Sequence, residues 1–582
     1  MNVKHHGIRV CLACIVFVVP HPLVIITTVS QLQTQSTIMS ISIQQIGYIH
    51  PDKEVLFSEL SFSISKGQKI GLVGNNGCGK STLLQIIAGQ LSPSSGVVVC
   101  PDDLYYIPQH FGQYDALTIA QAIRIDSKQH ALHAILNGDA SNDHFTILND
   151  DWNIEERSIV ALDSWGLDKF PLSYPMQLLS GGEKTRVFLA GMEIHHSSVI
   201  LMDEPTNHLD ASGRQRLYNW VDKFHSTLLI VSHDRTLLNL LPEICELEKH
   251  SITYYGGNYE FYKEQKALAQ QALQQRIEEK EKALRAAKKI ARETEERRDK
   301  QNVRGEKRNA AKGVPRIVLN SLESKSERST SKLNDVHQKK AEKITEERNL
   351  LRNSLSPTTG LKTDFNGSSL HFGKILITAK DINFSYHTDQ GDSHTQNTVT
   401  TEKYLWRTPL SFQLKSGDRL RIEGLNGSGK TTLLKLITGK IEPLTGTLTR
   451  ADFTYVYLNQ EYSIIDNQKS ILEQIYAFNT RNLPEHELKI ILNRYLFPAS
   501  EWNKSCRKLS GGEKMRLAFC CLMVSNNAPD LFILDEPTNN LDIQSIQIIT
   551  ETIKMYTGTV IAISHDTYFI REIGVEQHIL LQ

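Results

Sequence analysis

Short apolar runs alternate with amphipathic stretches over two long portions of the chain, from about Met39 to Gly257 and from about Lys374 to Gln582. Examples are Ile70–Val73, Val199–Met202 and Leu531–Leu534. Apolar runs separated by segments of helix length are typical of parallel strands joined by helices. The pattern therefore predicts an α/β architecture with a largely parallel sheet in each portion.

The segment between the two portions has a different pattern, rich in charge and alanine with few aromatic residues. Its first half follows roughly a heptad seam, broken by one lysine: Leu273, Ile277, Lys280, Leu284, Ala287 and Ala291. Its second half has a looser apolar stripe: Leu333, Val336, Ile344 and Leu351. This spacing predicts two helices folded back on each other, each about 35 residues and roughly 50 Å long. Three residues argue against continuous helix at the turn: Gly305, Gly313 and Pro315.

Residues 1–38 fit neither pattern. Their apolar run, Val10–Val19, is shorter than the roughly 20 residues of a spanning helix, and Pro20 and Pro22 follow it. Met39 is followed at once by the strand-like SISIQQIGYIH. Our hypothesis is that Met39 is the true start and that residues 1–38 are a mis-called extension or apolar leader. A signal peptide or single anchor is the alternative.

The net charge does not indicate any class of binding partner, because 65 Lys and Arg balance 65 Asp and Glu. The eight cysteines form no paired framework, which favours a reducing cytoplasm. Cys11 and Cys14 form a CxxC without a second ligand pair, so we expect no metal role for them.

Four motifs occur twice in the same order, so the two portions are duplicates. They are GLVGNNGCGKST at 71–82 with IEGLNGSGKTT at 422–432, LSGGEKTR at 179–186 with LSGGEKMR at 509–516, ILMDEPTNHLD at 200–210 with ILDEPTNNLD at 533–542, and VSHD at 231–234 with ISHD at 563–566. We predict two domains, 39–257 and 374–582, joined by a linker over 258–373.

The first motif predicts a phosphate-binding loop, because it follows a strand-like run and precedes a helical one. Its glycines let backbone N–H groups face phosphate oxygens at a helix N-terminus, and its lysine adds a charge at the β- and γ-phosphates. The hydroxyls of Ser81 and Thr431 would ligate Mg²⁺. An idle glycine-rich turn is the alternative for a single copy. The predicted ATP-binding residues here are Gly74, Asn75, Asn76, Gly77, Cys78, Gly79, Lys80, Ser81 and Thr82, with Gly424, Leu425, Asn426, Gly427, Ser428, Gly429, Lys430, Thr431 and Thr432.

Two apolar runs end in Asp-Glu. An aspartate at the end of a buried strand can hold the Mg²⁺ shell, which predicts that role for Asp203 and Asp535. The next residue can polarise the attacking water, so Glu204 and Glu536 are the predicted general bases. Carboxylates that merely cap the next turn are the alternative.

Taken together, these motifs resemble ATP-binding cassette ATPases, and the DEPTNHLD and DEPTNNLD forms resemble the ABC-F family, which lacks transmembrane domains. The resemblance covers nearly all of the chain after residue 38. It implies that ATP is sandwiched between the phosphate loop of one cassette and the LSGGE signature of the other. Signature residues Ser180, Gly181 and Gly182 would close on ATP of the second cassette, and Ser510, Gly511 and Gly512 on ATP of the first.

Further roles follow from the same resemblance. His233 and His565 match the switch histidine at the γ-phosphate, and Gln109 and Gln460 match the glutamine that senses Mg²⁺ and the γ-phosphate. Asp210 and Asp542 match the acidic residue that links the sites. Tyr48, and more weakly Tyr386, stand where an aromatic ring stacks on adenine, with core packing as the alternative. Both sites keep every element, which implies two hydrolysing sites within one monomeric chain.

The predicted turn of the linker is basic. Eight Lys or Arg against two acids lie between Arg297 and Arg316, which suits a phosphate backbone, although a solvated charged helix pair is the alternative. The predicted RNA-binding residues are Arg297, Arg298, Arg304, Lys307, Arg308, Lys312 and Arg316. In ABC-F members that bind ribosomes, this linker approaches tRNA and ribosomal RNA.

The leading hypothesis is a ribosome-associated translation ATPase, including antibiotic resistance by ribosome protection. The alternatives are the ATP-binding subunit of a transporter and a DNA-repair type ATPase. The interval between Gln109 and Ser180 is longer than that between Gln460 and Ser510. The extra residues, around His130 to Trp152, are few and not basic, so we expect no long arm there.

Overall fold

The computed structural model describes residues 39–51, 53–139, 141–248, 251–311, 316–353, 370–386, 404–425, 427–459, 462–525, 529–539 and 541–581. Several sequence predictions fall outside these ranges: residues 1–38, Asn426, Gln460, Lys312, and the polar stretch His387–Glu402, for which the sequence predicts a surface loop.

The first cassette is built on a six-stranded sheet in the order β5-β6-β7-β3-β8-β9, in which only the last pair is antiparallel. A second, antiparallel sheet has the order β2-β1-β4. The strands are β1 Met39–Ile49, β2 Val55–Ser65, β3 Lys69–Val73, β4 Ser95–Val99, β5 Leu104–Ile107, β6 Val199–Asp203, β7 Thr227–Val231, β8 Glu243–Leu247 and β9 Ile252–Tyr255.

The second cassette repeats this plan. Its parallel sheet has the order β14-β15-β16-β12-β17, and its antiparallel sheet the order β11-β10-β13. The strands are β10 Ile375–Asn383, β11 Leu410–Lys415, β12 Arg419–Gly424, β13 Thr445–Arg450, β14 Tyr455–Leu458, β15 Leu531–Asp535, β16 Thr559–Ile563 and β17 Gln577–Leu581. The predicted tandem α/β fold with a helical linker is confirmed.

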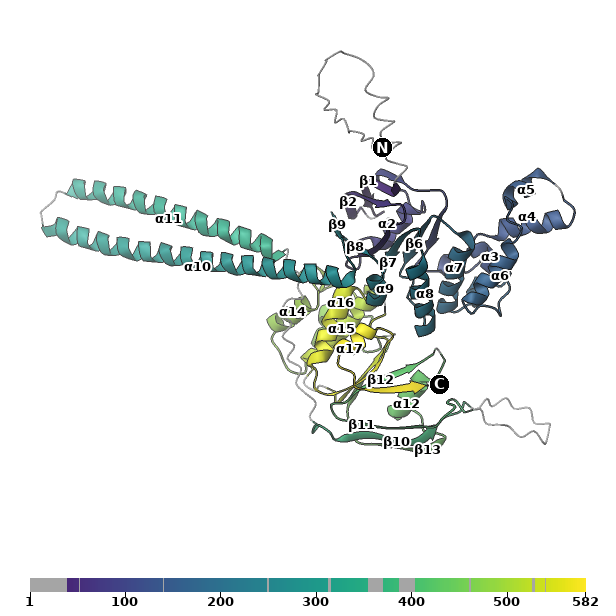
Figure 1. Ribbon diagram of the computed structural model, residues 1–582. Helices are drawn as coiled ribbons and strands as arrows, with labels where there is room; N and C mark the ends of the chain where they lie inside the picture. Colours follow the sequence, from purple (N-terminus) through teal and green to yellow (C-terminus); the bar gives the residue numbers. More distant parts are fainter. Residues whose placement is uncertain are drawn as a thin grey trace, which may run out of the picture.

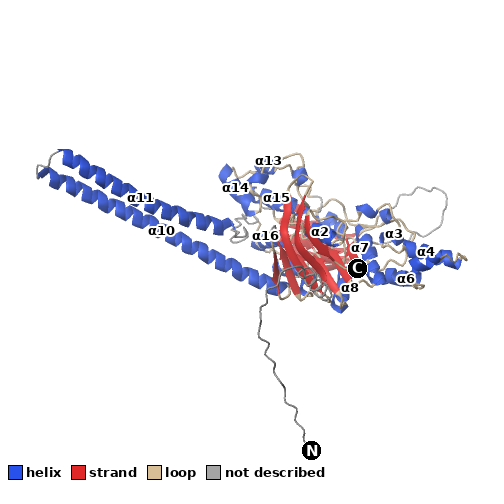
Figure 2. Ribbon diagram, turned by 90° about the horizontal axis from the view of Figure 1, so that it is seen from above, coloured by secondary structure: helices blue, strands red, loops and turns tan. Residues whose placement is uncertain are grey.

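Helices cover both parallel sheets (Figures 1 and 2). In the first cassette they are α2 Lys80–Ile87, α3 Ile119–Ala122, α4 Asp126–Leu136, α5 Asn142–Leu148, α6 Ile154–Ser164, α7 Gly181–His195, α8 Ala211–Lys223 and α9 Arg235–Asn239. In the second they are α12 Lys430–Ile437, α13 Ile471–Phe478, α14 Glu485–Arg494, α15 Gly511–Val524, α16 Ile543–Met555 and α17 Thr567–Glu572.

The central strands β6 and β7 are buried along their whole length, as is β16. A strand covered on both faces needs apolar side chains at every position, which is why these sequences are continuous apolar runs rather than alternating ones. The first polar residues after such runs emerge together at the carboxyl edge of the sheet. This edge is where an open parallel sheet places its ligand site.

Two long helices form the linker: α10 Tyr259–Ala311, of 53 residues, and α11 Arg316–Asn353, of 38. They lie side by side and extend away from the cassettes, on the side opposite to α4 and α5 (Figures 1 and 2). The predicted seam is present, with Ile277 and Leu284 each only 7% exposed. Lys280, the polar break, pairs with Glu347 of α11 at 2.6 Å between Nζ and Oε2.

Two details of the linker prediction were wrong. Helix α10 continues through Gly305, because the cost of one glycine, about 1 kcal/mol, is small against a long packed helix. Helix α10 ends at Ala311 and α11 begins at Arg316, and Arg297 and Arg304 stand exposed on α10. The predictions for Gly313 and Pro315 lie outside the described residues. Val336 is 62% exposed and does not belong to the seam, whereas Ile344 and Leu351 are half-buried.

The residues added in the first cassette form the short helices α4 and α5 and no long arm. Within the described residues, no helix is both long enough and apolar enough to cross a membrane.

The two cassettes contact each other through buried polar groups. Arg235, at the start of α9, is 5% exposed, and its guanidinium reaches Asp566 at 3.2 Å and Glu572 at 2.9 Å in the second cassette. The same guanidinium lies 5.4 Å from the ring centroid of Tyr568. Lys263 of α10 also reaches Glu572, at 3.4 Å. The base of the linker thus joins the contact between the cassettes.

Candidate functional site

Both phosphate loops have the same geometry. Each lies between a parallel strand and a helix, β3 to α2 and β12 to α12, and each ends in a left-handed glycine, Gly79 with φ 97° and Gly429 with φ 89°. A Cβ on Gly79 would lie 2.8 Å from the Leu56 side chain. Both this close approach and the left-handed φ require glycine at the position.

The loop lysines are held by the loops themselves. Lys80 Nζ donates to the carbonyls of Gly74, at 2.7 Å, and Asn75, at 3.1 Å. Lys430 Nζ donates to the carbonyls of Gly424, at 2.8 Å, and Leu425, at 3.1 Å. These contacts hold each ammonium at the N-terminus of its helix, where phosphate oxygens can replace the carbonyls.

The Asp-Glu pairs stand at the carboxyl ends of β6 and β15. Glu204 and Glu536 both adopt φ 50°, an uncommon left-handed conformation for glutamate. Each is fixed by a hydrogen bond from its own amide to the next strand: Glu204 to the carbonyl of Val231, and Glu536 to that of Ile563, both at 2.8 Å. Such strain is retained where the surrounding structure imposes it, as at catalytic sites.

Burial perturbs these carboxylates. It raises the pKa of Glu204 to about 8, against the opposing charge of Lys80, and that of Asp203 to about 6. In the second cassette, burial raises the pKa of Glu536 to about 7, and that of Asp535 also rises. A raised pKa makes the ionised carboxylate a stronger base, and a general base works best when its pKa lies near the operating pH.

Asp203 has the environment of a cation ligand. Both of its carboxylate oxygens are buried without a hydrogen-bond partner in the described structure, and the Ser81 hydroxyl is close enough to oppose the rise in its pKa. A buried orphan carboxylate is costly, and a divalent cation would satisfy it. In the second cassette one Asp535 oxygen accepts a hydrogen bond from Tyr457, at 2.8 Å. The donor set of Asp203 and Ser81 fits Mg²⁺.

The histidines of the SHD motifs face the glutamates. His233 Nε2 lies 3.4 Å from Glu204 Oε1, and His565 Nε2 lies 3.3 Å from Glu536 Oε1. Burial lowers the pKa of both histidines, to about 4 for His565. Each imidazole is therefore neutral at physiological pH and has a nitrogen that can contact a phosphate oxygen.

Each LSGGE motif is the start of a helix. Ser180 and Ser510 are N-caps, and each forms a capping box with the glutamate three residues later, Glu183 or Glu513. The next two residues are glycines, which add no side chain of their own to the first turn. A helix start of this kind is an anion site.

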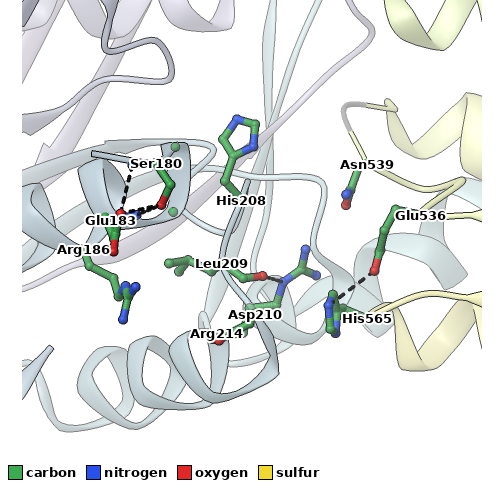
Figure 3. Close-up of a pocket in the computed structure, with 12 residues that line it drawn as sticks. Ser180, Glu183, Arg186, His208, Leu209, Asp210, Arg214, Glu536, Asn539 and His565 are labelled. Carbon is green, nitrogen blue, oxygen red and sulfur yellow. Dashed lines mark hydrogen bonds and ion pairs between the residues drawn. The ribbon is translucent and has the colours of Figure 1, made fainter. Parts of the chain in front are cut away.

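The structure brings the first signature and the second cassette around one cavity of about 490 Å³ (Figure 3). Ser180, Gly181 and Gly182 line one side, and Glu536 and His565 line the other. Their joint position is what a composite site for the second nucleotide requires. Asp210 also lines this cavity, and its carboxylate lies close enough to His565 to oppose the fall in the pKa of that residue.

The first site is organised differently. Asp542 Oδ2 accepts a hydrogen bond from the amide of Asn76, at 3.0 Å, so the second cassette touches the first phosphate loop directly. Gly74 to Cys78 also line a cavity of about 970 Å³, whose other walls come from α10 and α16. Ser510, Gly511 and Gly512 line neither this cavity nor the one in Figure 3, so their predicted role at the first site stays a prediction.

Three further predicted residues have their surroundings described. The half-buried ring of Tyr48 packs edge-on against His50, with centroids 5.5 Å apart. The Tyr386 hydroxyl is 2.6 Å from Thr432 Oγ1, so this residue does reach its loop despite the intervening polar stretch. Gln109, two residues after β5, is half-buried. No contact here tests their predicted roles.

Sequence reasoning missed several residues that line the cavity, and two of them bear on its chemistry. Arg214, on α8, and His208, whose ring would lie 3.4 Å from a Cβ on Gly181, both line the cavity of Figure 3. His208 lies two residues before Asp210, where the second cassette has Asn540. Arg214 lies four residues after Asp210, where the second cassette has Ile546. Comparing the two repeats position by position would have found them.

The ABC transporter family matches residues 57–207 and 408–539. Among the similar curated proteins, the uncharacterized ABC transporter ATP-binding protein YfmM of Bacillus subtilis (strain 168) is 27% identical, over 92% of this chain and 97% of its own. ABC transporter F family member 5 of Arabidopsis thaliana is 28% identical, over 89% of this chain and 72% of its own.

Two solved structures share the fold. The archaeal ribosome recycling factor aABCE1, in complex with ribosomal stalk protein aP1, has a TM-score of 0.54 at 17% identity, and covers 92% of this chain and 87% of its own. RNase-L Inhibitor has a TM-score of 0.53, with the same identity and coverage. At this identity the likeness shows the tandem-cassette fold alone.

Proposed function

This chain is an ABC-F-type ATPase with two tandem cassettes of the ABC transporter family, and from that premise we propose that it works as an ATP-driven clamp on the ribosome. Two ATP molecules bind between the cassettes and draw them together, and hydrolysis releases them. The observation that carries the proposal is the shared cavity of Figure 3, where the first signature faces Glu536 and His565 of the second cassette.

In the proposed mechanism the phosphate loops hold the triphosphates through backbone amides and through Lys80 and Lys430. Mg²⁺, held by Ser81 and Asp203 and by Thr431 and Asp535, would supply charge neutralisation at the β- and γ-phosphates. Glu204 and Glu536 orient a water and accept its proton as its oxygen attacks the γ-phosphorus. The neutral imidazoles of His233 and His565 hold the terminal phosphate.

The ribosome is proposed from the linker. A helix of 53 residues spans about 80 Å at 1.5 Å per residue, so the hairpin reaches far beyond the cassettes. Arg297 and Arg304 stand exposed towards its far end. An exposed basic end on a long projection fits the phosphate backbone of ribosomal RNA or tRNA. One structural relative is named as a ribosome recycling factor, which supports the same class of partner. We expect the protein to act as a monomer in the cytoplasm.

The test is sedimentation of the Glu204→Gln, Glu536→Gln double variant through a sucrose gradient with ribosomes and ATP. Co-migration with ribosomes that is lost without ATP would support the proposal. Fractionation with membranes would instead favour a transporter subunit, and retention on DNA without ribosomes would favour a DNA-repair ATPase. Either of these outcomes would contradict the ribosome proposal.

Antibiotic resistance by ribosome protection is the narrower hypothesis within this proposal. It predicts that the protein restores in vitro translation inhibited by at least one class of ribosome-targeting drug, and that the double variant does not. Failure across all classes would reject protection while leaving a translation role intact.

A further inference from the structure

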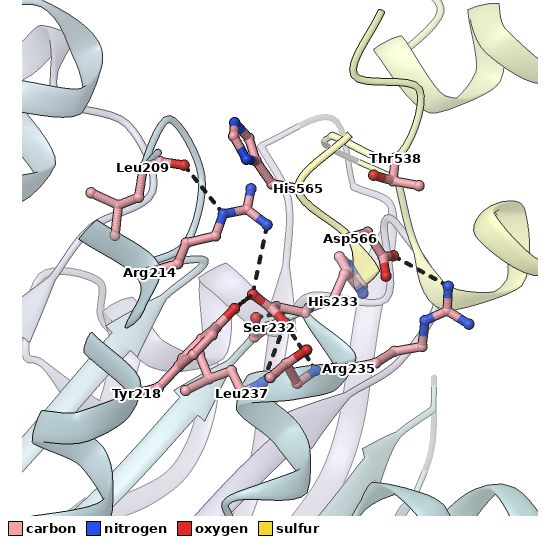
Figure 4. A network of polar contacts seen from close by, with 12 residues as sticks. Leu209, Arg214, Tyr218, Ser232, His233, Arg235, Leu237, Thr538, His565 and Asp566 are labelled. Atoms are coloured by element: carbon pink, nitrogen blue, oxygen red, sulfur yellow. Dashed lines mark hydrogen bonds and ion pairs between the residues drawn. The ribbon is translucent and has the colours of Figure 1, made fainter. Parts of the chain in front are cut away.

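Arg214 of the first cassette reaches into the ATP site of the second. It is the fourth residue of α8, just after Asp210, and its side chain is 12% exposed. Its Nε donates to the carbonyl of Leu209 at 3.2 Å, and a terminal nitrogen lies 3.7 Å from Asp234 Oδ2. Held in this way, the guanidinium points towards His565 and lines the cavity that Glu536 and the first signature share (Figures 3 and 4).

The charge of Arg214 acts on the second cassette. Among the charges that oppose the effect of burial on the pKa of Glu536, Arg214 is the strongest, ahead of Lys430 of the phosphate loop. Arg214 is also the leading charge that adds to the fall in the pKa of His565. The guanidinium therefore lies within electrostatic reach of the two residues that would flank the terminal phosphate.

At the position of the second cassette that matches Arg214 there is no cation. By the internal repeat, the counterpart of Arg214 is Ile546, the fourth residue of α16. Ile546 is 3% exposed and packs in the core of the second cassette. Arg214 and Ile546 both line a small cavity of about 30 Å³ beside Glu204 and His233, but Arg214 is not among the charges that shift the pKa of Glu204. The two sites thus differ at this position, which carries a cation in the first cassette and an apolar side chain in the second.

We propose that Arg214 contacts the terminal phosphate of the nucleotide held by the second cassette, and that this makes the second site the faster of the two. In hydrolysis, a water oxygen bonds to the γ-phosphorus, the bond to the β,γ-bridging oxygen breaks, and the proton passes to Glu536. Negative charge builds up on the phosphoryl and bridging oxygens, and a fixed guanidinium stabilises it. The products are ADP, phosphate and a proton. This inference rests on the composite sites proposed above.

The experiment isolates each site in the full-length protein. Glu204→Gln leaves only the second site hydrolysing, and Glu536→Gln leaves only the first. Arg214→Met is placed in both backgrounds, and single-turnover hydrolysis of ATP is measured together with ATP affinity. We expect about a 10²- to 10³-fold loss of rate at the second site, and a loss of less than about threefold at the first, with ATP affinity at the second site changed by less than about tenfold.

Two controls separate charge from packing. Arg214→Lys keeps the charge without the planar fork and should recover part of the second-site rate. Arg216→Met removes a neighbouring arginine of α8 whose guanidinium lies over the Trp165 ring, 5.8 Å from its centroid, and should leave both rates unchanged. Trapping of ADP with vanadate at the second site should fall with Arg214→Met, since vanadate mimics the phosphoryl group in transit.

An equal loss of rate in both backgrounds would overturn the inference, because it would mean that Arg214 acts through Asp234 on the interface as a whole. An unchanged second-site rate would overturn it as well. Failure of the underlying proposal has a different signature: if the Glu204→Gln, Glu536→Gln protein hydrolyses ATP at the parental rate, the assigned sites themselves are wrong.

Discussion

Asp542 of the second cassette accepts a hydrogen bond from the amide of Asn76 in the phosphate loop of the first, at 3.0 Å. Its carboxylate also caps α16, accepting from the amide of Ser545 at 2.8 Å. His233 and Asp542 influence each other: the carboxylate opposes the fall in the histidine pKa, and the histidine helps to lower that of Asp542. One side chain thus connects the start of a helix, a phosphate loop and a switch histidine.

Asp542→Asn should slow hydrolysis at the first site by about tenfold, equivalent to about 1.4 kcal/mol. The amides of Asn76 and Ser545 bind different oxygens of Asp542, and asparagine has only one oxygen, so the variant removes the negative charge near His233 and keeps one of the two hydrogen bonds. Single-turnover hydrolysis in the Glu536→Gln background measures the first site alone. Asp542→Ala should in addition lose the cap and about 1 kcal/mol of stability. If Asp542→Asn hydrolysed ATP at the first site at the parental rate, the negative charge of Asp542 would not contribute to hydrolysis there.

Replacing both predicted general bases should block hydrolysis without removing ATP. Glu204→Gln with Glu536→Gln leaves the phosphate loops intact but removes the proton acceptors, so we expect a loss of about 10²- to 10⁴-fold in steady-state ATPase rate. Filter binding should still detect bound nucleotide. Glu193→Gln is a control, since this half-buried carboxyl also has a raised pKa, caused by burial, but accepts hydrogen bonds from Trp165 and Ser164. A comparable loss in the control would contradict the assignment.

The nucleotide-free protein should lose stability as pH rises from about 6.5 to 8. Burial raises the pKa of Glu204 from 4.5 to about 8 and that of Glu536 to about 7, so the folded state keeps protons that the unfolded state has released. The unfolded state then binds fewer protons, and stability falls with pH over that range. The lowered pKa of His565, about 4 against 6.5 unfolded, acts in the opposite sense but at lower pH.

Thermal unfolding between pH 6.5 and 8.5 tests this expectation. The double glutamine variant, which has no proton to lose at either position, should give a flatter profile. A decline of the same slope in the variant would mean that other groups cause it.

Arg235→Met should weaken the contact between the cassettes. It leaves Asp566 without its cation and Glu572 with Lys263 alone, and removing the cation of a buried pair costs up to about 3–5 kcal/mol. Urea unfolding of the full chain measures the loss. Arg571→Met is the matched control, because this exposed guanidinium lies 5.0 Å from the centroid of the same Tyr568 ring without pairing to those carboxylates. If Arg235→Met lowered the free energy of unfolding by less than about 1 kcal/mol, the Arg235 ion pairs would contribute no more than exposed surface pairs do.

Replacing Arg304, Lys307, Arg308 and Lys312 with alanine should weaken association with ribosomes and leave ATP binding unchanged. If each cation contacts one phosphate of duplex RNA, the slope of log affinity against log salt should fall by up to about 0.9 per residue. Alanine at Arg276, Lys282, Arg285 and Lys288 removes the same charge nearer the cassettes, where all four are exposed on α10. Equal effects of the two sets would argue for bulk charge rather than the end of the hairpin.

Local chemistry made much of the fold and the phosphate loops predictable. The glycine pattern of Gly79 and Gly429, the apolar runs of β6 and β15, and the Ser-Glu spacing at each signature all act over a few residues. Arg214 was missed because the cavity that it lines is shared with Glu536 and His565 of the other repeat, and local spacing carries no information on which residues of the two repeats lie together. Gly305 was misread for the opposite reason: the packing of a long helix outweighed the preference of one residue.

The continuity of α10 has a mechanical consequence. Its first turns are tied to both cassettes, through the ion pair of Lys266 with Glu246 and that of Lys263 with Glu572. A lever about 80 Å long, at 1.5 Å per residue, moves its far end by roughly 14 Å for a tilt of about 10° at the base. A small rearrangement of the cassettes around ATP would therefore appear at the end of the hairpin as a displacement several times larger.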